Sequence, residues 1–318
     1  MNRISLTALL LASAFGMSAS AAEPDFKAAY ADFSALRIGF PQSEICQSVK
    51  CDSGAEPGVF TAAVTSGEVT LRFDKRGKLF QKTLSAKTRE FSPDYYAGLA
   101  DGLAMRYGLL GRQGAYASDW LLANDDVFAE MSVRRDDVTV TVSNLRYPYE
   151  AWLADARRDR ALRVKLPVFP SGFFVGEISY DRVKKAVRCK GDPESEEGAV
   201  CRVPRLGKDG VVVRTFAGTD VLKTVTVPLG KGKLTVEQVR SANPQLKETA
   251  DGVLSVKGDE ALGGVRRETL ADGRSVVTFF AAKPVIDYYE HQEGFHLLKN
   301  EVEKLSQSVA EPAAKPQN

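Results

Sequence analysis

The cysteines and histidines are the residues of this chain whose types and spacing could most directly support chemistry. The four cysteines form two close pairs, Cys46 with Cys51 and Cys189 with Cys201, with four and eleven residues between the partners. A zinc site needs short cysteine spacings together with nearby histidine or further cysteine, which this sequence does not place beside either pair. Because an even number of closely spaced cysteines is typical of disulfides in an oxidising compartment, we predict these two local bridges and no metal ion.

The only two histidines, His291 and His296, are the candidates for a general base. Nucleophilic catalysis requires such a base beside the nucleophile. Five residues on a helix correspond to a rotation of about 140°, so the two rings do not share one face. Neither a G-x-S-x-G elbow nor an H-E-x-x-H pair occurs in the sequence. We therefore nominate no catalytic residue and no cofactor.

Paired carboxylates are the remaining possibility for catalysis, since two of them can hydrolyse a glycosidic bond. The candidates by residue type are Asp125-Asp126, Asp136-Asp137 and the group Glu194, Glu196 and Glu197. Charged turns of this kind are more often solvated faces, so an extracytoplasmic hydrolase is kept only as the alternative function. The acidic loop at residues 192–197 lacks the regular ligand spacing of an EF-hand, and whether it binds calcium stays open.

Two aromatic groups are the candidate binding residues. Tyr147, Tyr149 and Trp152 follow the first half of the chain, and Tyr288 with Tyr289 follows the second half. Tyrosine, tryptophan and arginine are enriched at protein interfaces. The competing interpretation is that each group seals the sheet of its own half, and the residues alone favour that interpretation.

The first residues predict the cellular location. Arg3 precedes an apolar run and then the small residues Ser18-Ala19-Ser20-Ala21-Ala22, which is the pattern of a secretory signal peptide at residues 1–22. The run is shorter than the ~20 apolar residues of a membrane span, and we expect no integral membrane segment in the mature chain. The whole chain carries 43 Lys+Arg and 41 Asp+Glu, so the near-neutral balance gives no electrostatic footprint for nucleic acid. We expect a periplasmic or secreted protein.

Periodicity along the chain predicts an α+β fold. Helical spacing covers residues 25–36, and Ser92-Pro93 and Pro148 each begin a further helix. Alternation predicts strands at residues 59–65, 68–73, 78–84, 127–133 and 138–142. The second half follows a similar order: a helix from Ser179, strands at 211–216 and 221–227, a capping box at Thr235 with Gln238, strands at 253–256, 265–270 and 276–280, and a last helix from Pro284.

The similar order suggests two similar units, each an antiparallel sheet packed with helices, that arose by internal duplication. VTLR at residues 69–72 corresponds to VVVR at residues 211–214, and Pro148 corresponds to Pro284. We place the first unit at residues 23–163 and the second at 164–310. The remaining tail, residues 311–318, is disordered by composition.

The repeated pattern of an apolar residue and glycine, a short helix, a loop and antiparallel strands resembles the β-lactamase-inhibitory-protein family and the small outer-membrane lipoprotein assembly factors. The stretches that carry the resemblance are residues 37–43 with 69–84 and residues 174–179 with 211–227. The resemblance implies tandem helix-plus-sheet units whose sheets bind a protein partner. The helices after Ser92 and Pro148 are departures from that pattern, and no binding residue of the family transfers to this chain.

Together these features favour a secreted or periplasmic binding protein without catalytic activity, of the envelope-interaction or inhibitor type. Its expected partner is a protein or another cell-envelope component. In the last helix, Phe295, Leu298, Val302, Leu305 and Val309 form a heptad seam of about two heptads. Docking along the body of the protein is the first interpretation of this seam, and a homodimer through residues 295–309 is the second.

Overall fold

The chain folds into two antiparallel sheets that are each packed with helices, which confirms the α+β class. The computed structural model describes residues 25–88, 92–113, 119–159, 162–169, 173–206, 210–230, 233–248, 253–256 and 263–310. The predicted signal peptide and the predicted tail lie outside these residues. Within them, no helix combines the length and the apolar character needed to cross a lipid bilayer.

The first sheet takes its strands from the first half of the chain, in the order β1-β2-β3-β4-β8-β7-β6-β5. Its strands are β1 (Cys51–Ser53), β2 (Val59–Val64), β3 (Gly67–Phe73), β4 (Leu79–Lys87), β5 (Leu110–Gln113), β6 (Asp119–Ala123), β7 (Val127–Arg134) and β8 (Asp137–Asn144). The helices of this half are α1 (Phe26–Ala35), α2 (Gln42–Ser48), α3 (Pro93–Tyr107) and α4 (Arg146–Arg158).

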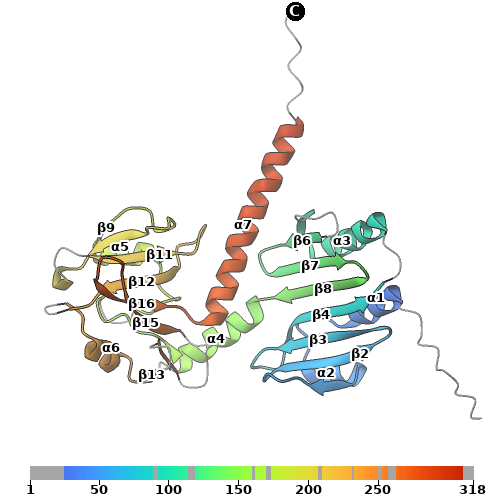
Figure 1. The fold of residues 1–318 in the computed structure, drawn as a ribbon, viewed down its shortest axis with the longest axis horizontal. Coiled ribbons are helices and arrows are strands. Elements are labelled where there is room, and N and C mark those ends of the chain that lie inside the picture. The colour runs from blue at the N-terminus through green and yellow to red at the C-terminus, as the bar shows by residue number, and fades with distance from the viewer. Residues whose placement is uncertain are drawn as a thin grey trace, which may run out of the picture.

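The second sheet repeats this connectivity strand for strand, in the order β9-β10-β11-β12-β16-β15-β14-β13. Its strands are β9 (Arg188–Lys190), β10 (Ala199–Arg202), β11 (Val211–Thr215), β12 (Leu222–Pro228), β13 (Leu246–Glu248), β14 (Val253–Val256), β15 (Gly264–Thr269) and β16 (Ser275–Phe280). The helices of this half are α5 (Tyr180–Ala186), the short 3-10 helix η2 (Pro204–Leu206), α6 (Val236–Ala242) and α7 (Lys283–Ala310). Figure 1 shows the two sheets on either side of α4 and α7.

Each sheet consists of two four-stranded meanders joined at its centre, where β4 pairs with β8 and β12 pairs with β16. Helix α3 stands before the second meander of the first sheet, and α6 holds the same place in the second sheet. The helix after Ser92 therefore has a counterpart in the second half, and its departure from the pattern of the resembled family stays a prediction.

Local details also recur between the two halves of the chain. The register of β3 with β4 shifts between Arg72 and Phe73, and that of β11 with β12 shifts between Arg214 and Thr215. The common strand order and these matching bulges are what a duplication would leave, and the duplication itself stays an inference.

Several helix boundaries follow the signals in the sequence. The Ser92 side chain accepts a hydrogen bond from the Tyr95 N–H, with Pro93 in the first turn, and α3 ends at Gly108 in the left-handed conformation. Thr235 and Gln238 form the predicted capping box of α6. These caps satisfy backbone groups that a helix end leaves without partners.

Five short strands were not predicted from the sequence: β1, β5, β9, β10 and β13. They are three or four residues long, so they carry little alternation from which a strand can be predicted. Four of the five, β1, β5, β9 and β13, lie at the outer edges of the two sheets. Pairing with a longer neighbour, rather than local propensity, makes these segments strands.

Both predicted disulfides are confirmed. Cys46 in α2 bonds to Cys51 in β1. Cys189 in β9 bonds to Cys201, which is its direct pairing partner in β10. The first bridge thus joins a helix to an edge strand, whereas the second joins two strands. Two disulfides fit a location outside the cytoplasm.

Candidate functional site

The first sheet has one face covered by α1 and α3, and an opposite face that α7 contacts at its β6–β7 end and that carries polar side chains at its centre. Alternate residues of its strands, among them Leu71, Leu84 and Val140, are buried in one core with Phe33 of α1 and Tyr96 of α3. The intervening residues point to the other face. An antiparallel sheet commonly keeps one face in water, so the chemical character of that face decides whether it is distinctive.

A row of four threonines crosses the centre of this open face. Strand register places Thr61 opposite Thr70, Thr70 opposite Thr83, and Thr83 opposite Thr141. The hydroxyls of Thr83 and Thr141 lie 3.1 Å apart and form a hydrogen bond. All four side chains are partly exposed. The row is therefore an ordered line of hydroxyl groups across four adjacent strands.

The neighbouring rows extend this uncharged area. On one side Gln81 donates a hydrogen bond at 3.2 Å to the hydroxyl of Ser143, which is itself buried, and on the other side Ser85 lies opposite Thr139. The charged side chains stand around this area rather than within it: Glu68, Arg72, Lys87 and Glu130. Protein interfaces are likewise depleted of charged residues at their centre and polar at their rim.

The second sheet has a shorter version of this feature. Thr226 and Thr278 hydrogen-bond at 3.0 Å between β12 and β16, at the place where Thr83 and Thr141 pair in the first sheet. Their neighbours in the same row are Val212 and Arg266. The continuous hydroxyl row is thus a property of the first sheet.

The two predicted groups of aromatic binding residues, far apart in the sequence, meet between the two sheets. The rings of Tyr149 and Tyr288 stack at 4.5 Å with an interplanar angle of 5°. The hydroxyls of Tyr149 and Tyr289 lie 3.3 Å apart, and Tyr289 also stacks on Phe216 of the second unit. Burial and the Tyr149 hydroxyl raise the pKa of Tyr289.

The other two predicted binding residues, Tyr147 and Trp152, lie at separate places along α4. Tyr147 packs over Gly39 of the first unit, with the Lys78 ammonium 5.3 Å from its ring. Trp152 is buried in the core of the second unit. No common surface therefore joins all five residues, and their binding role stays a prediction.

Helices α4 and α7 each begin on their own unit and continue onto the other unit. The first turn of α4 packs on Gly39, whereas Trp152 and Ala156 further along α4 belong to the second core. The first turn of α7 packs on Gly176 of the second unit through Val285. Further along α7, His291 contacts the first unit. The boundary expected at residue 163 therefore comes after α4, which already packs on both units.

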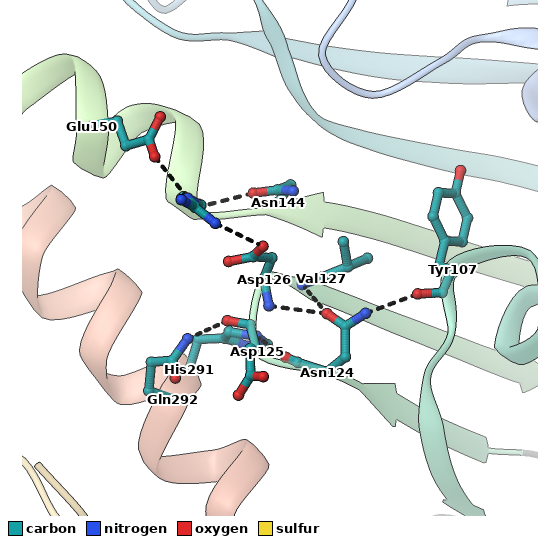
Figure 2. Close-up of polar contacts among 10 residues, drawn as sticks. Tyr107, Asn124, Asp125, Asp126, Val127, Asn144, Glu150, His291 and Gln292 are labelled. Atoms are coloured by element: carbon teal, nitrogen blue, oxygen red, sulfur yellow. Dashed lines mark hydrogen bonds and ion pairs between the residues drawn. The ribbon is translucent and has the colours of Figure 1, made fainter.

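A polar network fixes α7 to the turn between β6 and β7 (Figure 2). His291 Nε2 lies 2.8 Å from the Asn124 carbonyl oxygen, and the Gln292 side-chain amide donates a hydrogen bond to the Asp125 carbonyl oxygen. Burial lowers the pKa of His291 below its ordinary value of 6.5. Its ring also packs against that of Phe128, with an interplanar angle of 81°. A neutral imidazole is the form that fits this buried position.

Asn124 holds the same turn in shape. Its side-chain oxygen accepts hydrogen bonds from the Asp126 and Val127 N–H groups, and its side-chain nitrogen donates to the Tyr107 carbonyl. Arg146 at the start of α4 pairs with Asp126 at 3.2 Å and with Glu150 at 2.6 Å. Figure 2 shows these contacts joining α4, α7 and the turn in one network. All of these contacts join groups of the protein to one another.

The carboxylates considered for hydrolysis lie at three separate places. Asp125 and Asp126 occupy the β6–β7 turn, and the Lys87 ammonium binds both Asp136 and Asp137, at 3.1 and 2.8 Å. The acidic loop is held against β11 by its backbone, because the Arg214 guanidinium donates to the Glu196 carbonyl. Over the part of the chain that the structure describes, no three His, Cys, Asp or Glu side chains gather as a metal site.

The threonine row is the site feature that sequence reasoning missed. The alternation in residues 138–142 placed Thr139 and Thr141 on one face of a strand, but the row depends on the register of four strands that the sequence does not specify.

No protein-family model, curated protein or solved structure matches this chain.

Proposed function

We propose that this chain is a binding protein of the periplasm or the extracellular space that acts without catalysis. In this proposal the open face of the first sheet binds a protein or another component of the cell envelope. The observation that carries the proposal is the uncharged hydroxyl area around Thr83 and Thr141 with charged residues at its edge. Interfaces typically have few charged residues at their centre and a polar rim.

The architecture supports this choice of surface. Strands paired on both sides hold the central threonines in fixed positions, so that little conformational freedom is lost on binding. The resemblance to inhibitory proteins that bind partners through tandem sheets points to the same mode of recognition. The two disulfides support a location outside the cytoplasm, where such a partner would be met.

A photo-crosslinking experiment in the native host tests the proposed surface. A photoreactive phenylalanine analogue replaces Ser85, which is exposed on the open face, or Met105, which is 83% exposed on α3 on the other side of the sheet. We expect a discrete adduct from position 85 and none from position 105. Thr83→Arg, introduced beside the probe, should remove the adduct because it places a charge at the centre of the area.

Two results would contradict the proposal. One is an adduct of the same identity and yield from both probe positions. The other is an adduct from position 85 that Thr83→Arg leaves unchanged. Hydrolysis of a polysaccharide by the purified protein would instead favour the alternative function.

A further inference from the structure

A pocket of about 340 Å³ lies between α7 and the first sheet, at the end of the sheet where β6 and β7 meet that helix. Its walls are apolar side chains from both sides: Leu121, Ala123 and Phe128 from the sheet, Leu145 after β8, and Phe295 and Leu298 from α7. Ligand pockets are typically apolar hollows of ~300–1,000 Å³ and often occur where domains meet. An apolar cavity of ~150 Å³ holds benzene, so this pocket has room for a larger aromatic molecule.

The charged groups that line the pocket are already engaged by the protein. Asp287 pairs with Lys283 at 2.7 Å, and Glu290 pairs with Lys223 at 3.0 Å. His291 Nε2 lies 2.8 Å from the Asn124 carbonyl oxygen. A ligand charge would have to displace one of these partners or lose its water without compensation. The lining therefore favours an uncharged ligand.

Helix α7 makes polar contacts beside the pocket and mainly apolar contacts within it. On one side, polar contacts fix the helix to the β6–β7 turn through His291 and Gln292. Inside the pocket the facing groups are mainly apolar, and they leave space between α7 and the sheet. A partly open, mainly apolar hollow of this volume between two docked elements is suited to a guest.

We propose that this pocket binds a small, uncharged, apolar molecule with two or three rings, or of similar bulk, between α7 and the first sheet. The site lies on the same face of the first sheet as the hydroxyl area, since Phe128 is the direct partner of Ser143, but at the β6–β7 end and with other residues. Because its walls come from α7 and from the first sheet, an occupied pocket ties the last helix more firmly to the first unit.

Fluorescence titration of the full mature protein with N-phenyl-1-naphthylamine tests this site. The probe is uncharged at neutral pH and brightens in apolar surroundings. We expect saturable binding of one molecule per chain. The sulfonated analogue 8-anilinonaphthalene-1-sulfonate has the same rings and a negative charge, and it should bind at least tenfold more weakly.

A pair of glycine variants locates the binding. Gly294 lines the pocket, and a Cβ added there meets no atom within 4 Å, so Gly294→Leu adds a bulky apolar side chain at the pocket without a backbone clash. Gly102 on α3 is equally open, and Gly102→Leu is the matched control. We expect the half-saturation concentration to rise at least tenfold in Gly294→Leu and to stay unchanged in Gly102→Leu.

The proposal is overturned if the neutral probe shows no saturable binding, or if both glycine variants weaken it equally. It is also overturned if the sulfonated analogue binds as tightly as the neutral probe. Crosslinking from position 85 is independent of these results, because that residue lies outside the pocket, so failure of one proposal can be distinguished from failure of the other.

Discussion

Lys82 is the charged residue most deeply buried in the first core. It is 1% exposed on the helix-covered face of β4, and its Nζ donates to the carbonyl oxygens of Phe33 and Leu36, both at 2.7 Å. These two carbonyls lie at the C-terminal end of α1, which leaves acceptors without intrahelical partners. Lys82 thus joins the end of α1 to the middle of the sheet.

The titration of Lys82 should make the stability of the first unit depend on pH. Burial and the nearby charge of Arg106 lower the pKa of Lys82 from 10.5 to about 7. Between about pH 7 and 10.5 the unfolded chain holds a proton that the folded chain has lost. The free energy of unfolding should therefore rise with pH in this range, by up to about 1.4 kcal/mol per pH unit.

Urea unfolding between pH 7 and 9, followed through Trp120 in the first core, measures this slope. Lys82→Met should flatten it, whereas Lys190→Met, which removes an exposed lysine from β9, should leave it unchanged. Equal slopes in the wild type and Lys82→Met would show that Lys82 keeps its proton throughout this range.

At the scale of elements, His291 should make the docking of α7 sensitive to acid. Its folded-state pKa is lowered mainly by burial, while the Asn124 carbonyl and the charges of Asp126 and Asp125 act in the opposite direction. The stabilisation is therefore complete above about pH 6.5 and is lost as the pH falls toward the folded-state pKa. Acidification from pH 7.5 to 5.5 should loosen α7 from the β6–β7 turn.

Hydrogen exchange of residues 119–134 and of α7 reports this loosening as faster exchange at low pH, after correction for the intrinsic rate. His291→Gln keeps a side-chain donor but does not titrate, and it should remove the pH effect. His296→Gln, at an exposed position five residues further on, is the control. Persistence of the full effect in His291→Gln would assign it to another group.

Gly176, in the segment before α5, shows how closely a helix approaches a connecting segment. Gly176 has φ +80°, and a Cβ added there would lie 3.0 Å from the Ala281 Cβ and 3.1 Å from a Val285 methyl group. Gly273 in the β15–β16 hairpin has the same φ and no atom within 4 Å of an added Cβ. The pair therefore separates the cost of backbone conformation from the cost of crowding.

Gly273→Ala should lower the free energy of unfolding by about 1–2 kcal/mol, the cost of a left-handed residue with a Cβ. Gly176→Ala should add about 1–3 kcal/mol for overpacking against the start of α7. Denaturant unfolding followed through Trp152, which lies in the second core, gives both values. Equal losses would mean that α7 moves aside without cost.

The sequence predicted the elements whose signals are local and missed those that depend on pairing. Ser92, Thr235 and Gly108 mark helix ends through groups within a few residues of each other, so their roles could be predicted. Strand β9 has only Arg188, Cys189 and Lys190, and it becomes a strand because β10 pairs with it. The threonine row and the pocket needed the register of distant strands and the position of α7, for which the sequence holds no local signal.

At the scale of the whole molecule, helices α4 and α7 join the two units, because each of them packs on both. Trp152 follows the first sheet in the sequence but is 4% exposed within the second core. Trp152→Ala should therefore destabilise the second unit by roughly 3–5 kcal/mol, as large-to-small changes in a core do. Leu122→Ala, at a residue 5% exposed in the first core, is the matched control.

Hydrogen exchange by mass spectrometry distinguishes the two variants by region. Trp152→Ala should lose protection mainly in residues 173–228, and Leu122→Ala mainly in residues 59–87 and 119–144. If Trp152→Ala instead affected only the first sheet, α4 would belong to the first unit alone.

Because α4 and α7 each pack on both units, the chain can finish folding only after its last helix has been synthesised. The first sheet leaves the ribosome complete, yet its apolar side chains Leu121 and Phe128 have no α7 beside them until the last helix has been made. Asn124 and His291, which hold that helix in place, are 167 residues apart. Contacts of such long sequence separation form late, and apolar surface that stays exposed meanwhile favours aggregation. A chain that is truncated before α7 therefore has a first unit with this apolar surface uncovered, even when the core of that unit is well packed.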